Sequence, residues 1–262
     1  MSFHTPKEIS TLAIQAGVAK NRLSVLSLLI LGFLAGAFIA FGFLLYIHIV
    51  NQLPAEWGSF GVLLGAAVFP VGIIITILAG GELLTGNMML LPIAWFARKI
   101  SLLGLLRNWF WVTISNFIGS IAVAWLFGHL LGMTEGDYLK KTVAIASAKV
   151  NADFLHAFIS GIGCNWLVCL ATWLAFASKD TAGKILGMWF PVMAFVGIGF
   201  QHVVANMFVV PAAIFAGYLS WFEYLPNFVA VFLGNTVGGA VFVGLAYFIA
   251  FRSRPEETFM TH

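Results

Sequence analysis

The apolar stretch GIGFQHVVANM, residues 197–207, contains an ionisable side chain, His202. It lies within a longer segment, residues 185–222, that has no Asp, Glu, Lys or Arg. Its polar neighbours in the stretch are Gln201 and Asn206. An imidazole titrates near neutral pH, and ionisable groups within apolar membrane segments line ion or proton pathways by default. We therefore predict that His202 acts on a charged or protonatable solute. The alternative is a structural histidine bonded to a backbone carbonyl.

The composition indicates that lipid surrounds most of the chain. Of the 262 residues, 61% are hydrophobic and 9% are charged, against roughly 25% charged residues in a soluble domain. One crossing of a bilayer needs about 20 apolar residues of helix. Uncharged stretches run over 23–55, 57–81 with 83–97, 108–134, 154–178, 185–222 and 224–251. Residues 57–97 and 185–222 are each too long for one straight helix and too short for two helices with a turn.

Basic residues between these stretches predict the orientation of the chain. They precede the first stretch and follow the second, fourth and sixth: Lys20, Arg22, Arg98, Lys99, Arg107, Lys179, Lys184, Arg252 and Arg254. The connectors at Glu56 and Glu223 carry no Lys or Arg. Because positively charged loops stay in the cytoplasm, this alternation predicts six crossings with both termini cytoplasmic. The connector 134–153 is an exception, since its three lysines, Lys149 among them, lie on the outer side and would attract anions.

An internal repeat relates the two halves of the chain. An offset of 119 residues aligns GGELLTGNMMLLP (80–92) with GFQHVVANMFVVP (199–211). Identical pairs at this offset include Gly80/Gly199, Asn87/Asn206, Met88/Met207, Pro92/Pro211, Val112/Val231, Asn116/Asn235, Gly119/Gly238 and Leu126/Leu245. Each half has an odd number of crossings, three, so the halves have opposite orientations. Such an inverted repeat with a discontinuous helix in each half is typical of transporters, whose permeation site lies near the midplane.

The two long stretches are predicted to be broken helices. Backbone at membrane depth leaves the helix only where protein or a water-filled cavity satisfies its polar groups. The expected break points are glycines: Gly80, Gly81 and Gly86 in the first stretch, and Gly187, Gly197 and Gly199 in the second. The halves differ at the breaks, where Leu83 corresponds to His202 and Thr85 to Val204. We predict a pore that is symmetric in backbone and asymmetric in chemistry.

Four motifs resemble those of the formate/nitrite transporter family of bacterial and archaeal membrane channels. They are ILAGGELLTG (77–86), GIGCNWLVCLA (161–171), GFQHVVANM (199–207) and GNTVGG (234–239), with Leu84 where Phe or Ile is usual. The resemblance covers essentially the whole chain. It implies an all-α membrane protein with an aquaporin-like protomer. Its six transmembrane helices would form an inverted three-plus-three repeat, with helices two and five broken. It also implies a homopentamer in a bacterial or archaeal cytoplasmic membrane that passes small monovalent anions.

The resemblance assigns roles to several polar residues. His202 matches the central pore histidine, and Thr85 matches the threonine of the loop that breaks helix two. Asn165 matches the fourth-helix asparagine, and Lys149, sixteen residues earlier, matches a lysine near the outer mouth. We expect Lys149 and Asn165 to draw an anion into the outer vestibule, where Thr85 and backbone N–H groups hold it. Without the resemblance, Lys149 would be a solvated loop charge.

Two apolar constrictions are implied on either side of the histidine. Leu83 and Ile73 match the cytoplasmic one, and Phe69 and Phe195 match the outer one. One position departs from the family pattern, because Gln201 stands where the family usually has Glu. A neutral neighbour removes a charge that would favour the imidazolium form of the histidine.

Three further polar residues near the breaks are predicted to be structural. Glu82 is expected to satisfy N–H groups of the broken helix or to pair with a base, because a fixed carboxylate facing the pore would repel an anion. Asn87 and Asn206, alike in both halves, are expected to fasten the backbone at the breaks. Cys164 and Cys169 do not share a helical face, and no metal or cofactor site is predicted.

The predicted function is a channel or transporter for small monovalent anions, most directly formate, with proton-linked passage at His202. Nitrite or hydrosulfide transport stays open as an alternative. So do a neutral-solute channel and a non-transporting membrane anchor for a formate-using enzyme. An enzyme is not predicted, because no nucleophile triad or nucleotide loop occurs. The expected partners are formate, protons and membrane lipids, with no nucleic acid.

Three segments divide the chain in this prediction. Residues 1–22 form a cytoplasmic amphipathic segment, residues 23–251 form the channel domain, and residues 252–262 form a cytoplasmic tail. Within the channel domain the two repeats cover about 23–127 and 154–251.

Overall fold

The computed structural model describes residues 3–251, so the predicted C-terminal tail, 252–262, lies outside the described residues. Six helices in the described part are long and apolar enough to cross a membrane: Val25–Asn51, Gly58–Ala79, Leu102–Leu130, Phe154–Ala177, Thr181–Ile198 and Trp221–Phe251. The predicted all-α fold with six crossings is confirmed.

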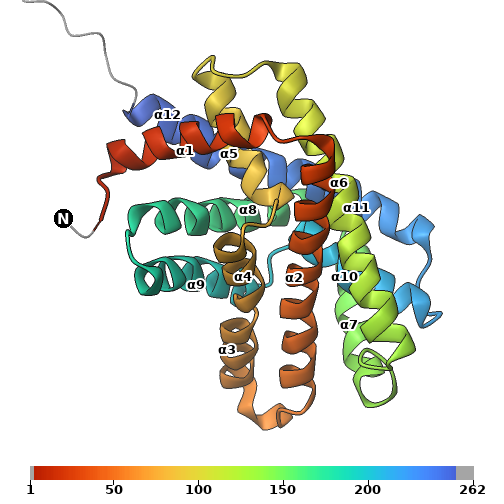
Figure 1. The fold of residues 1–262 in the computed structure, drawn as a ribbon. Coiled ribbons are helices and arrows are strands. Elements are labelled where there is room, and N and C mark those ends of the chain that lie inside the picture. Colours follow the sequence, from red (N-terminus) through yellow and green to blue (C-terminus); the bar gives the residue numbers. More distant parts are fainter. Residues whose placement is uncertain (1–2, 252–262) are drawn as a thin grey trace, which may run out of the picture.

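The helices form a bundle with one short helix across one end. In chain order they are α1 (Pro6–Asn21), α2 (Val25–Asn51), α3 (Gly58–Val68), α4 (Val71–Ala79), α5 (Leu84–Phe96), α6 (Leu102–Val123), α7 (Leu139–Val150), α8 (Phe154–Ala177), α9 (Thr181–Ile198), α10 (Val203–Phe215), α11 (Trp221–Gly239) and α12 (Ala246–Phe251). Single π-helical segments, Ala124–Leu130 and Ala240–Leu245, continue α6 and α11. Helix α1 lies across one end, beside α5 and α12, and α7 lies toward the other end (Figure 1).

Short polar side chains fix where many of the helices begin. Each accepts a hydrogen bond from a backbone N–H of the first turn, which otherwise has no partner within the helix. These N-cap residues are Thr5 for α1, Ser24 for α2, Ser101 for α6, Asp153 for α8, Asp180 for α9 and Ser220 for α11. The caps flank the apolar stretches, so each stretch enters the bundle at a defined residue.

The two predicted breaks have the same geometry. Helix α4 ends before Gly80, whose φ is 91°, and α9 ends before Gly199, whose φ is 88°. Both glycines adopt the left-handed conformation, which only glycine enters without steric cost. After three further residues the chain becomes helical again, at Leu84 in one half and Val203 in the other. The repeat offset of 119 residues therefore relates both the ends and the restarts of these helices.

The expected break points at Gly86, Gly187 and Gly197 are wrong, because these glycines lie inside α5 and α9. One of them, Gly187, allows close packing instead. A Cβ on Gly187 would lie 3.2 Å from the Leu174 side chain, which is closer than ordinary van der Waals contact. Small residues at such contacts let membrane helices approach one another.

A further interruption separates α3 from α4 at Pro70, which has no N–H to donate within the helix. The indole of Trp189 on α9 donates to the nearby carbonyl of Ala67 at 2.9 Å. A neighbouring helix thus satisfies part of the disrupted backbone, as the lipid environment requires.

Candidate pore and its two vestibules

Two cavities approach the breaks from different sides of the bundle. The α7-side vestibule, about 370 Å³, reaches Gly199, Gln201 and His202, and α7 contributes part of its wall. The α1-side vestibule, about 530 Å³, reaches Gly80 and Glu82, and α1 contributes part of its wall. Each cavity therefore ends at the break of one repeat.

His202 lies at the inner end of the α7-side vestibule and is 2% exposed. It is the N-cap of α10, where its Nδ1 accepts a hydrogen bond from the N–H of Ala205 at 3.0 Å. Its Nε2 lies 2.9 Å from Oγ1 of Thr85 on α5. The two broken helices thus meet through these side chains.

This geometry assigns a tautomer to the imidazole. Because Nδ1 accepts from a backbone N–H, the proton of the neutral ring is assigned to Nε2, which donates to Thr85. A second proton has to occupy Nδ1 and displace the N–H of Ala205. Forming the imidazolium therefore removes the cap of α10.

Thr85 is fully buried and lines neither vestibule. Its carbonyl accepts from Nδ2 of Asn165 at 3.2 Å and from Sγ of Cys169 at 3.4 Å. Nδ2 of Asn165 also donates to the carbonyl of Asn235 at 2.7 Å. Asn165 lines neither vestibule either, so its expected place in the outer vestibule is wrong. Its amide is directed at backbone carbonyls, and the residue positions Thr85.

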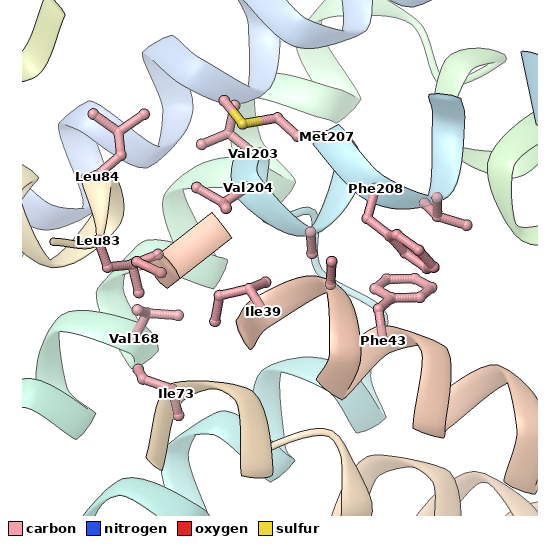
Figure 2. Close-up of a cluster of buried hydrophobic side chains, with 14 of the residues drawn as sticks. Ile39, Phe43, Ile73, Leu83, Leu84, Val168, Val203, Val204, Met207 and Phe208 are labelled. Atoms are coloured by element: carbon pink, nitrogen blue, oxygen red, sulfur yellow. The ribbon is translucent and has the colours of Figure 1, made fainter. Parts of the chain in front are cut away.

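Apolar side chains close the space beside Thr85 and His202. Leu83 and Ile73 are 3% and 2% exposed and converge with Val168 (Figure 2). They line neither vestibule. On the other side, the rings of Phe69 and Phe195 have centroids 5.7 Å apart, and both line the α7-side vestibule.

The ring of Phe195 also stacks on that of His202, with centroids 5.8 Å apart. The structure therefore places one of the predicted constriction residues, Phe195, directly beside the histidine, and Phe69 packs against Phe195.

Two equivalent asparagines hold the backbone at the breaks. Oδ1 of Asn116 accepts from the N–H of Leu84, and its Nδ2 donates to the carbonyl of Glu82. Asn235 forms the same bonds with the N–H of Val203 and the carbonyl of Gln201. Buried backbone groups need such partners.

Asn87 and Asn206, which were expected to fasten the backbone, bond side chains instead. Nδ2 of Asn87 donates to Oε2 of Glu82 and to Oδ1 of Asn108, both at 2.9 Å. Oε1 of Glu82 lies 2.6 Å from Nζ of Lys20 on α1. The expectation that Glu82 pairs with a base matches this contact. Because it is bound to Lys20, the Glu82 carboxylate does not act as a free negative charge in the pore.

The second half repeats this network with a neutral residue at its centre. Oε1 of Gln201 accepts from Nδ2 of Asn206 at 3.0 Å and from Nδ2 of Asn227 at 2.8 Å. Asn227 also donates to the carbonyl of Lys149 at 2.7 Å, as Asn108 does to that of Lys20 at 3.3 Å.

The ammonium of Lys149 has no carboxylate within 4.0 Å among residues 3–251. Lys149 lines the α7-side vestibule, and burial lowers its pKa to about 8. It remains mostly charged at pH 7, so the vestibule presents an uncompensated positive charge to a solute.

Comparison with known proteins agrees with this architecture. A family model described as Formate/nitrite transporter matches residues 7–249. The chain belongs to the formate/nitrite transporter family. The match includes both breaks, both vestibules and the Thr85–His202 pair.

Relatives within the formate/nitrite transporter family share most of their length with this chain. An uncharacterised transporter of Bacillus subtilis (strain 168), YrhG, is 59% identical over 98% of both chains. The formate channel BtFdhC of Bacillus thuringiensis is 57% identical, covering 97% of this chain and 98% of its own.

Two solved structures of the family superpose on the fold. One, described as an FNT family ion channel, has a TM-score of 0.86 at 31% identity and covers 93% of this chain and 98% of its own. The other, described as a pentameric formate channel with formate bound, has a TM-score of 0.76 at 31% identity and covers 87% and 98%.

Three residues of the hydrogen-bond networks at the breaks were not predicted from the sequence: Asn108, Asn227 and Lys20. Asn108 and Asn227 are related by the same offset of 119 residues that aligns the motifs. Lys20 and Lys149 are related by a second offset, 129 residues, which also aligns Gly32 with Gly161. That second offset is the signal that was available, and it would have shown that the two lysines occupy equivalent places.

Proposed function

We propose that this protein is a transmembrane channel or transporter for small monovalent anions, with formate as its substrate, rather than an enzyme. The observation that carries this proposal is the buried Thr85–His202 hydrogen bond between two vestibules that contain lysines. The relatives described as formate channels support formate as the anion. The hydroxyl of Thr85 and the imidazole of His202 can contact the carboxylate of a substrate. Because their surroundings are apolar, no fixed negative charge beside them repels it.

In the proposed path, Lys149 attracts the anion into the α7-side vestibule by its uncompensated charge. The anion passes Phe69 and Phe195 and reaches His202 and Thr85. The hydroxyl of Thr85 is the group placed to donate a hydrogen bond to it, since Nε2 of His202 already donates to the Thr85 oxygen.

The apolar constriction at Leu83 and Ile73 favours a neutral form of the substrate. A bare anion in such a place costs several kcal/mol even after relaxation. Formic acid does not carry that cost, but a carboxyl group with a pKa near 4 is almost fully ionised at pH 7. We propose that passage is linked to a proton at His202, which either donates it or pairs with formate as imidazolium. Both routes require Nδ1 to release the N–H of Ala205.

We further propose that the chain assembles as a homopentamer in the cytoplasmic membrane of a bacterial or archaeal cell, among membrane lipids, with both termini cytoplasmic. The structural relative described as pentameric supports the assembly. The basic connectors near the α1 side support the orientation. In this arrangement residues 1–22 lie at the cytoplasmic surface, residues 23–251 form the channel, and the α7-side vestibule faces outward.

Uptake by proteoliposomes tests this function. We expect rapid uptake of formate with co-movement of protons, compared with nitrite, hydrosulfide and acetate over pH 5 to 8. His202→Asn is the informative variant, because asparagine caps a helix well but does not titrate. We expect it to abolish the pH dependence of formate uptake below pH 7, where Lys149 stays mostly charged. An unchanged pH profile would refute the role of His202, and an absence of anion flux from the wild type would indicate a non-transporting anchor.

A further inference from the structure

The α1-side vestibule contains two lysines that differ in their surroundings. Lys20 and Lys184 both line the cavity, together with one acidic residue, Glu82. The ammonium of Lys20 is bound to Glu82 at 2.6 Å, and the Glu82 side chain is only 6% exposed. Within this ion pair the positive charge of Lys20 is largely cancelled, so Lys20 presents little net attraction to an anion in the cavity.

Lys184 has no comparable partner among residues 3–251, where no carboxylate lies within 4.0 Å of its ammonium. The nearest acid in sequence, Asp180, is occupied as the cap of α9. Its Oδ1 accepts from the N–H of Gly183 at 2.7 Å and its Oδ2 accepts from the hydroxyl of Ser178 at 3.1 Å. Lys184 is half-buried and lines the cavity, so its charge lies at the wall of the space open to a solute.

The position of Lys184 in α9 does not stabilise the helix. It is the fourth residue of the helix, near the end where backbone N–H groups carry a partial positive charge. A cation there is electrostatically unfavourable for the helix, and acidic residues are preferred. The charge is therefore better explained by what the vestibule binds than by local secondary structure.

We infer that Lys184 is the residue that captures small monovalent anions in the α1-side vestibule. It acts before the anion reaches the constriction at Leu83, and it is a counterpart in role to Lys149 in the other vestibule. This inference rests on the proposed anion transport and adds to it the identity of the capture residue on the α1 side. The ligand class is a compact anion such as formate, bound weakly by one ammonium group that stays partly hydrated.

An alternative explanation for the charge of Lys184 is that it only adds positive charge on the cytoplasmic side and so helps to set the orientation of the chain in the membrane. Lys179 provides a matched control, because it lies in the connector just before α9 but does not line either vestibule. Lys179→Gln and Lys184→Gln each remove one positive charge from nearby positions in the sequence. Only the second removes it from the cavity wall.

The test measures initial rates of formate uptake against formate concentration in membrane vesicles of both orientations. Protease access to an N-terminal tag identifies the vesicles whose α1 side faces the medium. In these vesicles we expect Lys184→Gln to raise KM by roughly two- to fivefold at low ionic strength, the scale of one partly exposed ion pair. In vesicles of the opposite orientation KM should stay near the wild-type value.

Two further variants and a salt series complete the test. Lys184→Arg should retain the wild-type KM, which shows that the site folds and needs only the charge, and Lys179→Gln should match the wild type. At ~1 M salt, where screening acts within about 3 Å, the effect of Lys184→Gln should disappear. The inference is overturned if Lys184→Gln behaves like Lys179→Gln, or if it changes KM equally in both orientations. A wild type without formate flux would instead refute the proposed function.

Discussion

The two breaks of the inverted repeat differ in charge while their hydrogen bonds are nearly the same. On the α1 side, Glu82 accepts from Asn87 and binds Lys20. On the α7 side, Gln201 accepts from Asn206, and the ammonium of Lys149 has no carboxylate partner among the described residues. An amide oxygen replaces a carboxylate oxygen in the same acceptor position. The comparison shows that this network can keep its geometry while the charge of a vestibule changes.

This difference leaves the two vestibules with unequal charge. Lys141 and Lys149 line the α7-side vestibule, and no acidic residue of the described part, 3–251, lies in its wall. The α1-side vestibule has two lysines and Glu82. The formal charges of the lining residues sum to +2 in the α7-side vestibule and to +1 in the α1-side vestibule, so the α7 side attracts anions more strongly. A carboxylate at position 201 would make the two sums equal.

The largest expected effect comes from making the two breaks alike at the pore centre. His202→Leu gives both repeats a leucine at this position and removes both bonds of the imidazole. We expect formate flux at pH 7 to fall by at least about tenfold, because proton transfer by a positioned group is lost. Stopped-flow uptake in proteoliposomes measures this. His202→Asn, which retains a cap, is the control, and full flux in that variant would show that capping rather than titration matters.

Breaking the ion pair on the α1 side is expected to have its main effect on stability. Glu82→Gln converts this network to the form seen on the other side and leaves the ammonium of Lys20 uncompensated. We expect the free energy of unfolding to fall by about 2 kcal/mol, the scale of a partly buried charged hydrogen bond. Denaturant unfolding in detergent measures the change. The double variant Lys20→Met with Glu82→Gln should recover part of the loss, and no recovery would argue against coupling between the two residues.

Adding a carboxylate on the α7 side should make the vestibules electrostatically similar. In Gln201→Glu the new group can bind Lys149 and still accept from Asn206 and Asn227. We expect KM for formate from the α7 side to rise by roughly two- to fivefold, while the α1 side stays unchanged. Uptake into oriented vesicles measures both values. Gln201→Met is a neutral control for loss of the hydrogen bonds, and an equal rise in that variant would exclude a charge effect.

The smallest expected effect is a pH dependence from Lys149. Burial lowers its pKa to about 8, so its ammonium is charged below pH 8 and loses its charge as the pH rises through that value. We expect KM from the α7 side to rise by roughly twofold between pH 7 and pH 9. Initial uptake rates at fixed proton gradient measure it. Lys149→Gln should show no such rise, and the same pH dependence in that variant would assign the titration to another group.

Much of the fold could be predicted because the bilayer limits the possible structures. Apolar stretches, basic connectors and the offset of 119 residues led to six crossings with two breaks, as observed. The same symmetry predicted that Thr85 and His202 lie at the two breaks, and the structure brings them into contact. The exact break glycines did not follow, because a glycine is equally compatible with a left-handed turn and with close helix packing. Gly80 and Gly187 have these two different roles.

The groups that polar side chains face were harder to predict than the depth of these side chains in the membrane. Asn165 and Lys149 were both placed in a vestibule, but only the lysine lines one. A residue in the middle of an apolar helix must satisfy its amide, and the sequence does not say whether the partner is a substrate or a backbone carbonyl. The contact between Lys20 and Glu82 joins residues 62 positions apart, and only packing of α1 on α5 brings them together.

Asn116 and Asn235 fix the backbone conformation of each break independently of the side chain at its centre. Each holds its break through backbone atoms of the two residues that flank Leu83 or His202, so the side chain of Leu83 or His202 takes no part in these bonds. After the duplication that such a repeat implies, one half can exchange an aliphatic group for an imidazole without rebuilding the loop. The transported solute can then change by single substitutions in a framework that both halves inherited.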